Sequence, residues 1–141
     1  MNRIIGIDYG KKRVGLAVTD PLQLFATALD TVAAHEAIAY LIRYAQQQPV
    51  ERWVVGYPKK LNNTPAQAAP DVDAFLKHLR TAFPAVPVTL ADERFTSRMA
   101  LQAMIDGGLK KKARRNKATI DKISAVIILQ GYLDARNRAT N

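Results

Sequence analysis

Short apolar runs, some continuous and some alternating with polar residues, divide the chain into segments with the pattern of β-strands. The predicted strands are Arg3 to Asp8, Arg13 to Thr19, a segment within Phe25 to Val32, Arg52 to Gly56, and Val86 to Ala91. The third segment also permits a helix, because Ala26, Ala28 and Leu29 favour that conformation. We expect five strands, of which the first three follow one another directly as a meander.

Other segments place apolar residues at the 3.6-residue spacing of amphipathic helices. The predicted helices are His35 to Gln48, one that begins at the capping box Thr64 to Gln67 or near Pro70, one from Thr96 or Ser97 to Gly107-Gly108, and one from a Thr119 cap to about Asn137. Pro70 predicts either a kink or a helix start close to that residue. Strands that alternate with helices after a meander indicate an α/β fold, with a mixed five-stranded sheet and helices on both faces. We expect one domain over residues 1–141.

Composition narrows the class of protein. The chain has 141 residues, 48% of them apolar, which suits a single domain with a hydrophobic core. No apolar stretch approaches the roughly 20 residues that span a bilayer, so we expect no membrane association. Met1-Asn2-Arg3 leads directly into the first predicted strand, so we expect no signal peptide. The absence of cysteine excludes disulfides and thiol catalysis, and it fits a cytoplasmic protein.

The charge of the chain points to a polyanionic partner. Lys and Arg number 21 against 12 Asp and Glu, a formal net charge of +9. Six of the eight residues from Lys110 to Lys117 are basic, so the excess is concentrated locally. A solvated surface loop is the simplest explanation of such a run, but its position immediately before Asp121 favours a nucleic-acid contact.

Three acidic residues lie at the tips of apolar elements. Asp8 ends the first strand, Glu93 follows the last one, and Asp121 opens the apolar C-terminal helix. Each has an ordinary alternative: a turn aspartate, a solvated charge and a favourable first-turn acid, respectively. Asp121 shares a helix face with the apolar Ala125 and Ile128, however, which predicts that it points toward the sheet. Carboxylates that converge from such positions are best explained by a divalent cation.

The acids Asp92 and Glu93 face opposite ways if the strand continues through them, and spacing does not decide which belongs to the cluster. A resemblance decides it. Four segments, in order along nearly the whole chain, are similar to the YqgF (RuvX) family: Gly6 to Gly10 with Arg13 to Gly15, Val54 to Pro58, Asp92 to Ser97, and Asp121 to Leu129. The family's acids map onto Asp8, Glu93 and Asp121. One departure is Asn62-Asn63-Thr64, where relatives often carry a glycine.

The resemblance implies an RNase H-like fold and metal-dependent phosphodiester hydrolysis. Family members are described as Holliday junction resolvases and as nucleases that mature the 5′ end of pre-16S rRNA. We therefore expect an endonuclease that uses Mg²⁺ or Mn²⁺ to cleave structured nucleic acid, in the first place the 5′ end of pre-16S rRNA. Its catalytic and metal-binding residues would be Asp8, Glu93 and Asp121, and it would be a monomer or homodimer. The residues expected to bind nucleic acid are Lys11, Arg13, Arg94, Arg98, Lys110, Lys111, Lys112, Arg114, Arg115 and Lys117.

Three other functions remain open from the sequence. Resolution of four-way DNA junctions would use the same acids. A non-catalytic RNA-binding protein would use the basic surface alone, and the three acids disfavour it. An actin-like ATPase is suggested by the Asp8-Tyr9-Gly10 turn, but the chain is too short for a two-domain nucleotide cleft.

Overall fold

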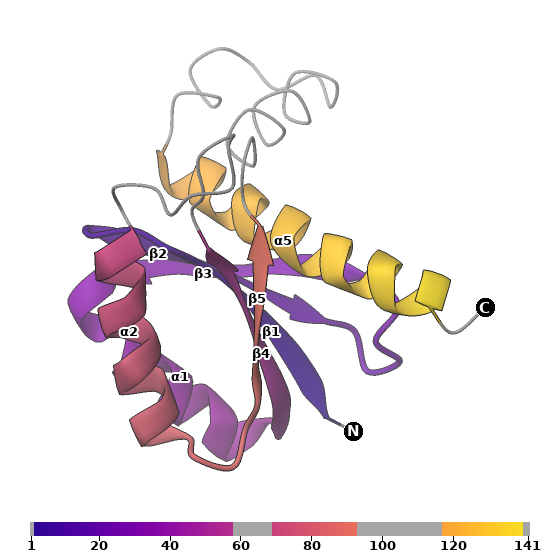
Figure 1. Ribbon diagram of the computed structural model, residues 1–141, viewed down its shortest axis with the longest axis horizontal. Coiled ribbons are helices and arrows are strands. Elements are labelled where there is room, and N and C mark those ends of the chain that lie inside the picture. The colour runs from indigo at the N-terminus through magenta and orange to yellow at the C-terminus, as the bar shows by residue number, and fades with distance from the viewer. Residues whose placement is uncertain (1, 58–68, 93–116, 140–141) are drawn as a thin grey trace.

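A computed structural model describes residues 2–57, 69–92 and 117–139, which build a five-stranded sheet in the order β3-β2-β1-β4-β5 (Figure 1). The strands are β1 (Arg3–Tyr9), β2 (Arg13–Thr19), β3 (Ala26–Ala33), β4 (Val50–Tyr57) and β5 (Val88–Asp92). β1, β2 and β3 form an antiparallel meander, whereas β4 pairs in parallel with both β1 and β5. The predicted mixed sheet is therefore confirmed.

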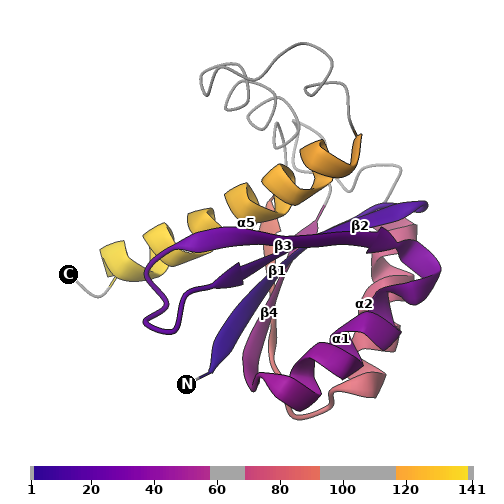
Figure 2. The same ribbon diagram turned by 180° about the vertical axis from the view of Figure 1, so that it is seen from behind.

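Helices cover both faces of this sheet, as Figures 1 and 2 show from opposite sides. They are the 3-10 helix η1 (Ala34–Glu36) and the helices α1 (Ala37–Gln47), α2 (Ala69–Ala82) and α5 (Lys117–Ala139). The helices α1 and α2 lie on one face, and α5 runs along the other. Although α5 has 23 residues, none of the described helices combines the length and apolar character needed to cross a membrane.

The alternation of side chains along each strand gives the sheet two separate cores. Ile5 and Ile7 of β1 pack on the α1 and α2 side, whereas Ile4 packs on the α5 side. The α5-side core consists of Ile4, Ala17, Val54, Ala125, Ile128, Leu129 and Leu133. Because β1 is buried on both faces, its apolar run is continuous rather than alternating.

The third predicted segment forms the strand β3, which excludes the helical alternative. Its residues pair with β2 in an antiparallel register from Arg13↔Ala33 to Thr19↔Ala26. Backbone pairing with a buried neighbour outweighs the modest helix preference of alanine, because propensity is weak against tertiary context.

The starts of α2 and α5 can be compared with the sequence predictions. α2 begins at Ala69, which places Pro70 inside the first turn, where its missing N–H group costs no hydrogen bond. This agrees with the predicted start near Pro70. α5 begins at Lys117, so Thr119 lies in the first turn and the prediction that it caps the helix is wrong. The capping box at residues 64–67 and the helix expected within residues 96–108 lie outside the described residues.

Polar contacts hold α5 against β3 along its length. The Thr31 hydroxyl donates to the carbonyl of Ala118 at 2.7 Å, and the Ala26 N–H donates to Gln130 Oε1 at 2.9 Å. The bond to Ala118 fixes the first turn of α5 beside the end of the sheet where β1 finishes, which is where the predicted site lies, and the bond to Gln130 holds the helix further along.

Candidate metal and nucleic-acid site

Asp8 is the second-last residue of β1 and is half-buried. Since Ile4 packs in the α5-side core, alternation places the side chain of Asp8 on that same face of the sheet. Across the antiparallel ladder, Asp8 lies directly opposite Gly15 of β2. The carboxylate therefore belongs to the surface that faces the beginning of α5, as the sequence predicted for a strand-end acid.

Gly15, the residue opposite Asp8, also packs closely against Asp121. A Cβ atom built on Gly15 would stand 2.0 Å from the carbonyl oxygen of Asp121 and 3.0 Å from its Cβ. No other residue type permits an approach this close, so the first turns of α5 rest directly on the backbone of Gly15. Asp8 and Asp121, far apart in the sequence, are thus the neighbours of one glycine.

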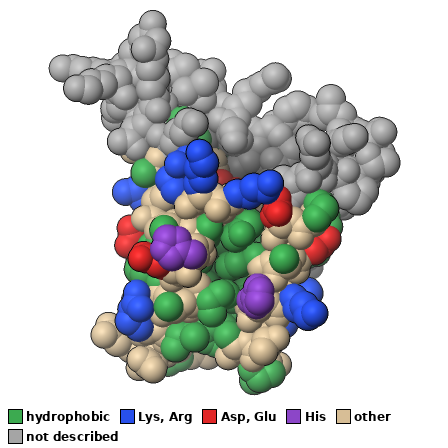
Figure 3. Space-filling view, turned by 90° about the vertical axis from the view of Figure 1, so that its left-hand side faces the viewer, with side chains coloured by type: hydrophobic (Ala, Val, Ile, Leu, Met, Phe, Trp, Pro, Cys, Tyr) green, Lys and Arg blue, Asp and Glu red, His purple; other side chains and the backbone are tan. Residues whose placement is uncertain are grey.

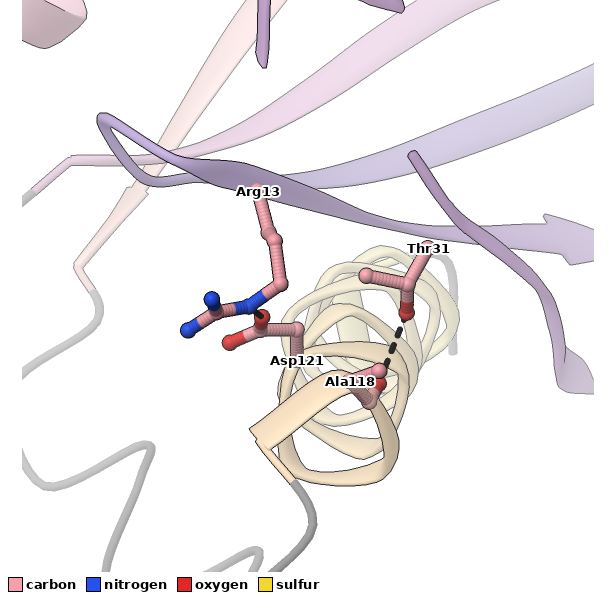
Figure 4. Close-up of polar contacts among 4 residues, drawn as sticks. All are labelled: Arg13, Thr31, Ala118 and Asp121. Carbon is pink, nitrogen blue, oxygen red and sulfur yellow. Dashed lines mark hydrogen bonds and ion pairs between the residues drawn. The ribbon is translucent and has the colours of Figure 1, made fainter. Parts of the chain in front are cut away.

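Arg13 points at Asp121 from β2. Its Nε donates to Asp121 Oδ2 at 3.1 Å, an ion pair whose side chains are 37% and 23% exposed (Figure 4). The close-up also shows the Thr31–Ala118 hydrogen bond at the start of the same helix. Sequence reasoning assigned Arg13 only to nucleic-acid contact and missed this pair. Arg13 and Gly15 share one face of β2, but no pattern in the sequence links that face to Asp121.

The two carboxylates fit a divalent cation by their chemistry. Both offer hard oxygen ligands from rigid elements, and Asp121 already attracts a cationic group. Within the ranges that the structure describes, no group of three or more His, Cys, Asp or Glu side chains is placed to hold a metal ion. Glu93, the third predicted ligand, lies outside the described residues, as do Arg94 and Arg98.

Part of the predicted basic surface is described. Lys11 is exposed and lies 3.6 Å from Asp71 Oδ2 of α2, and Lys117 begins α5. In Figure 3, Lys and Arg side chains lie along the border with the residues that are not described. The remaining predicted phosphate ligands, Lys110, Lys111, Lys112, Arg114 and Arg115, lie outside the described residues.

A family model described as "RuvX: Holliday junction resolvase" matches residues 2–135. The chain belongs to the RuvX family. The resemblance noted from four sequence segments is thereby confirmed, and with it the predicted class of protein, a nuclease.

Two relatives illustrate how closely the RuvX sequence is shared. A protein of Phocaeicola vulgatus is 52% identical over 136 residues, which cover 96% of this chain and 98% of the relative. A protein of Christiangramia forsetii is 52% identical over 133 residues, with 94% and 98% coverage. Both carry the name "Putative pre-16S rRNA nuclease".

Two solved structures share the fold. Thermus thermophilus RuvC in complex with a Holliday junction superposes with a TM-score of 0.58 at 23% identity, covering 97% of this chain and 96% of RuvC. The Fowlpox virus resolvase, also solved with Holliday junction DNA, gives 0.59 at 10% identity, with 95% and 98% coverage. The expected RNase H-like fold is confirmed by this likeness.

Proposed function

We propose that this RuvX-family protein is a divalent-metal-dependent endonuclease that cleaves structured RNA, with the 5′ end of the 16S rRNA precursor as its substrate. The observation that carries the proposal is that Gly15 pairs with Asp8 across the sheet and also packs against the backbone of Asp121. Two acidic residues from different elements, both backbone neighbours of one glycine, would supply the core of a hard-cation site. The choice of RNA rests on the name of the relatives, which match nearly the full chain at about half identity.

Glu93 is the third ligand in this proposal. β5 ends at Asp92, and Ala91 packs in the α5-side core. The acid pattern of the RuvX family, to which the chain belongs, favours Glu93 over Asp92 for this role. Mg²⁺ and Mn²⁺ are the ions that such an all-carboxylate set prefers.

The chain's own residues have separate tasks in the reaction. Asp8, Asp121 and Glu93 would hold the cation, which when bound would activate water and stabilise negative charge on the phosphate. Arg13 holds the Asp121 carboxylate by its Nε–H group. Lys11, Arg94 and Arg98, together with the basic run from Lys110 to Lys117, would bind the phosphates on either side of the cleaved bond.

The test compares cleavage of a labelled 16S rRNA precursor and a labelled four-way DNA junction, each with Mg²⁺, Mn²⁺ or a chelator. We expect metal-dependent cleavage of the RNA by the unmodified protein. Asp8→Asn and Asp121→Asn should abolish cleavage and largely spare binding, because each removes a ligand charge and leaves the basic surface. Asp134→Asn is the matched control, because it removes one exposed carboxylate from the same helix as Asp121. Metal-dependent cleavage retained by Asp8→Asn would refute the proposal.

Cleavage of four-way DNA junctions is the second candidate, favoured by the description of the family model and by the fold shared with two junction-bound resolvases. The same experiment separates it from RNA cleavage. Paired, symmetric cuts in the DNA junction, made by a stable dimer in sedimentation, would favour resolution. Chelator-insensitive binding without cleavage of either substrate would instead indicate a non-catalytic binding protein.

A further inference from the structure

We propose that Arg13 is a positioning residue that occupies Asp121 in the free protein and releases it to the cation when a nucleic-acid phosphate arrives. The inference rests on the proposed function, because it presupposes a divalent cation at Asp8 and Asp121. It goes further by assigning to one arginine the coupling between metal binding and substrate binding.

The geometry places Arg13 as a competitor of the cation. Its Nε–H group lies 3.1 Å from Asp121 Oδ2, and it stands two residues before Gly15 on the same face of β2. The pair is accessible to solvent, with side chains 37% and 23% exposed. Ion pairs of this exposure contribute at most about 1 kcal/mol, so a stronger partner can displace them.

Arg13 is not needed to hold the helix in place. The first turns of α5 are fixed independently by the Thr31–Ala118 hydrogen bond and by the contact of Gly15 with the Asp121 backbone. Loss of the guanidinium should therefore leave Asp121 where it is. What changes is the positive charge that faces the carboxylate.

That charge has opposite effects with and without nucleic acid. In the free protein, a guanidinium at Asp121 repels a divalent cation and shares its ligand, which weakens metal binding. A phosphate offers the guanidinium two oxygens in a planar, bidentate geometry, a stronger partner than one exposed carboxylate oxygen. Transfer of Arg13 to phosphate frees Asp121, so nucleic acid and cation should each raise the affinity of the other.

The test measures Mn²⁺ affinity by electron paramagnetic resonance of free Mn²⁺, without any cleavage step. We expect Arg13→Gln to bind Mn²⁺ roughly tenfold more tightly than the unmodified protein when nucleic acid is absent. Lys12→Gln is the matched control, because it removes the same charge from the adjacent, exposed position. It should change the affinity by less than about twofold, because an exposed charge is largely screened. Arg13→Lys keeps the charge and should stay close to the unmodified protein.

A second series adds a phosphorothioate-substituted RNA fragment from the 5′ end of the 16S precursor. The RNA should tighten Mn²⁺ binding by the unmodified protein and have a smaller effect on Arg13→Gln, whose Asp121 is already released. Far-ultraviolet circular dichroism checks that all three variants are folded. Unchanged or weaker Mn²⁺ binding by folded Arg13→Gln would overturn this inference alone. The proposed function is judged separately, by whether the unmodified protein cleaves RNA and Asp8→Asn does not.

Discussion

The backbone of Gly15 lies directly against the backbone of Asp121, so that a Cβ on the glycine would stand 2.0 Å from the aspartate's carbonyl oxygen and 2.4 Å from its carbonyl carbon. Gly6 packs just as closely against α5 further along the helix, because a Cβ built on Gly6 would stand 2.7 Å from Leu129 Cβ. The two glycines let the helix settle closely onto β1 and β2. The candidate site depends on this packing, because it carries Asp121 toward Asp8.

The first prediction concerns Gly15→Ala. The added methyl group collides with backbone atoms that cannot rotate away, so the first turns of α5 must shift. We expect a loss of about 1–3 kcal/mol in the free energy of unfolding, as for other overpacked sites. Mn²⁺ binding should fall as well, because Asp121 moves away from Asp8. Denaturant unfolding and Mn²⁺ titration measure the two effects.

Gly131→Ala is the control for this prediction. Gly131 lies in α5, the helix that Gly15 contacts, but a Cβ built on Gly131 meets no atom within 4 Å. Alanine should stabilise the protein by up to about 1 kcal/mol, because it favours helix more than glycine does. Equal stability of the Gly15→Ala and Gly131→Ala proteins would contradict the importance of the Gly15 contact.

The second prediction concerns Thr31→Val, which removes the hydroxyl that donates to Ala118 while keeping the shape of the side chain. We expect a loss of about 1 kcal/mol, the usual net contribution of such a bond. Amide hydrogens in the first turns of α5 should exchange faster, whereas those near Leu133 should change little. Thr27→Val serves as control, since its exposed hydroxyl makes only a 3.3 Å bond to Val18. Uniform acceleration along α5 would argue against a local role for Thr31.

The strands and the outer helices could be predicted because their signals are local. Continuous apolar runs in β1 and β4 indicate strands that are buried on both faces of the sheet. Pro70 predicts a helix start that lies within one residue of Ala69, where α2 begins. The position of Asp121 toward the sheet could be predicted in the same way. Ala125 and Ile128 share its helix face, and both are buried in the α5-side core.

The contacts within the site could not be predicted from such patterns. Arg13 and Asp121 are 108 positions apart, and charge patterning does not reveal which cation meets which acid. The close approach at Gly15 was also hidden, because a glycine is neutral in a hydrophobic periodicity. The role of Gly15 can be recognised only once the structure shows that β2 lies against α5.

The third prediction concerns the loop between β2 and β3 and its pH dependence. Asp20 Oδ1 accepts the N–H groups of Phe25 at 2.7 Å and Leu24 at 2.8 Å. The bond from Phe25 is the largest of the effects that hold the pKa of Asp20 below its ordinary value of 3.8. A lowered folded-state pKa stabilises the protein above the unfolded value, and that contribution disappears as the pH falls through the folded value.

Asp20→Asn should therefore lower the melting temperature near neutral pH, because the amide lacks the charge that these N–H groups favour. The difference from the unmodified protein should begin to shrink below a pH of about 4, where the carboxyl of the unfolded chain becomes protonated, and should disappear once the pH falls below the lowered pKa of the folded protein. Thermal melts across this range measure it. A difference that stays constant down to a pH of about 2 would show that Asp20 acts through shape and not through its charge.

The last prediction concerns the basic run from Lys110 to Lys117. If it binds backbone phosphates, neutralising Lys111, Arg114 and Arg115 together should weaken binding and also flatten its salt dependence. Each phosphate contact contributes about 0.7–0.9 to the slope of log affinity against log salt, so the triple variant should lose about two to three. Fluorescence anisotropy of a labelled RNA at several KCl concentrations gives the slope.

A second triple variant separates a local contact from the effect of net charge. Arg43, Lys77 and Arg80 are exposed on α1 and α2, and their replacement by Gln changes the net charge of the protein by the same amount. Because counterions are released only where phosphates are contacted, this control should keep nearly the full slope. An equal reduction in both variants would mean that nucleic acid responds to the overall charge of +9. The run before Asp121 would then have no special part in holding the substrate at the site.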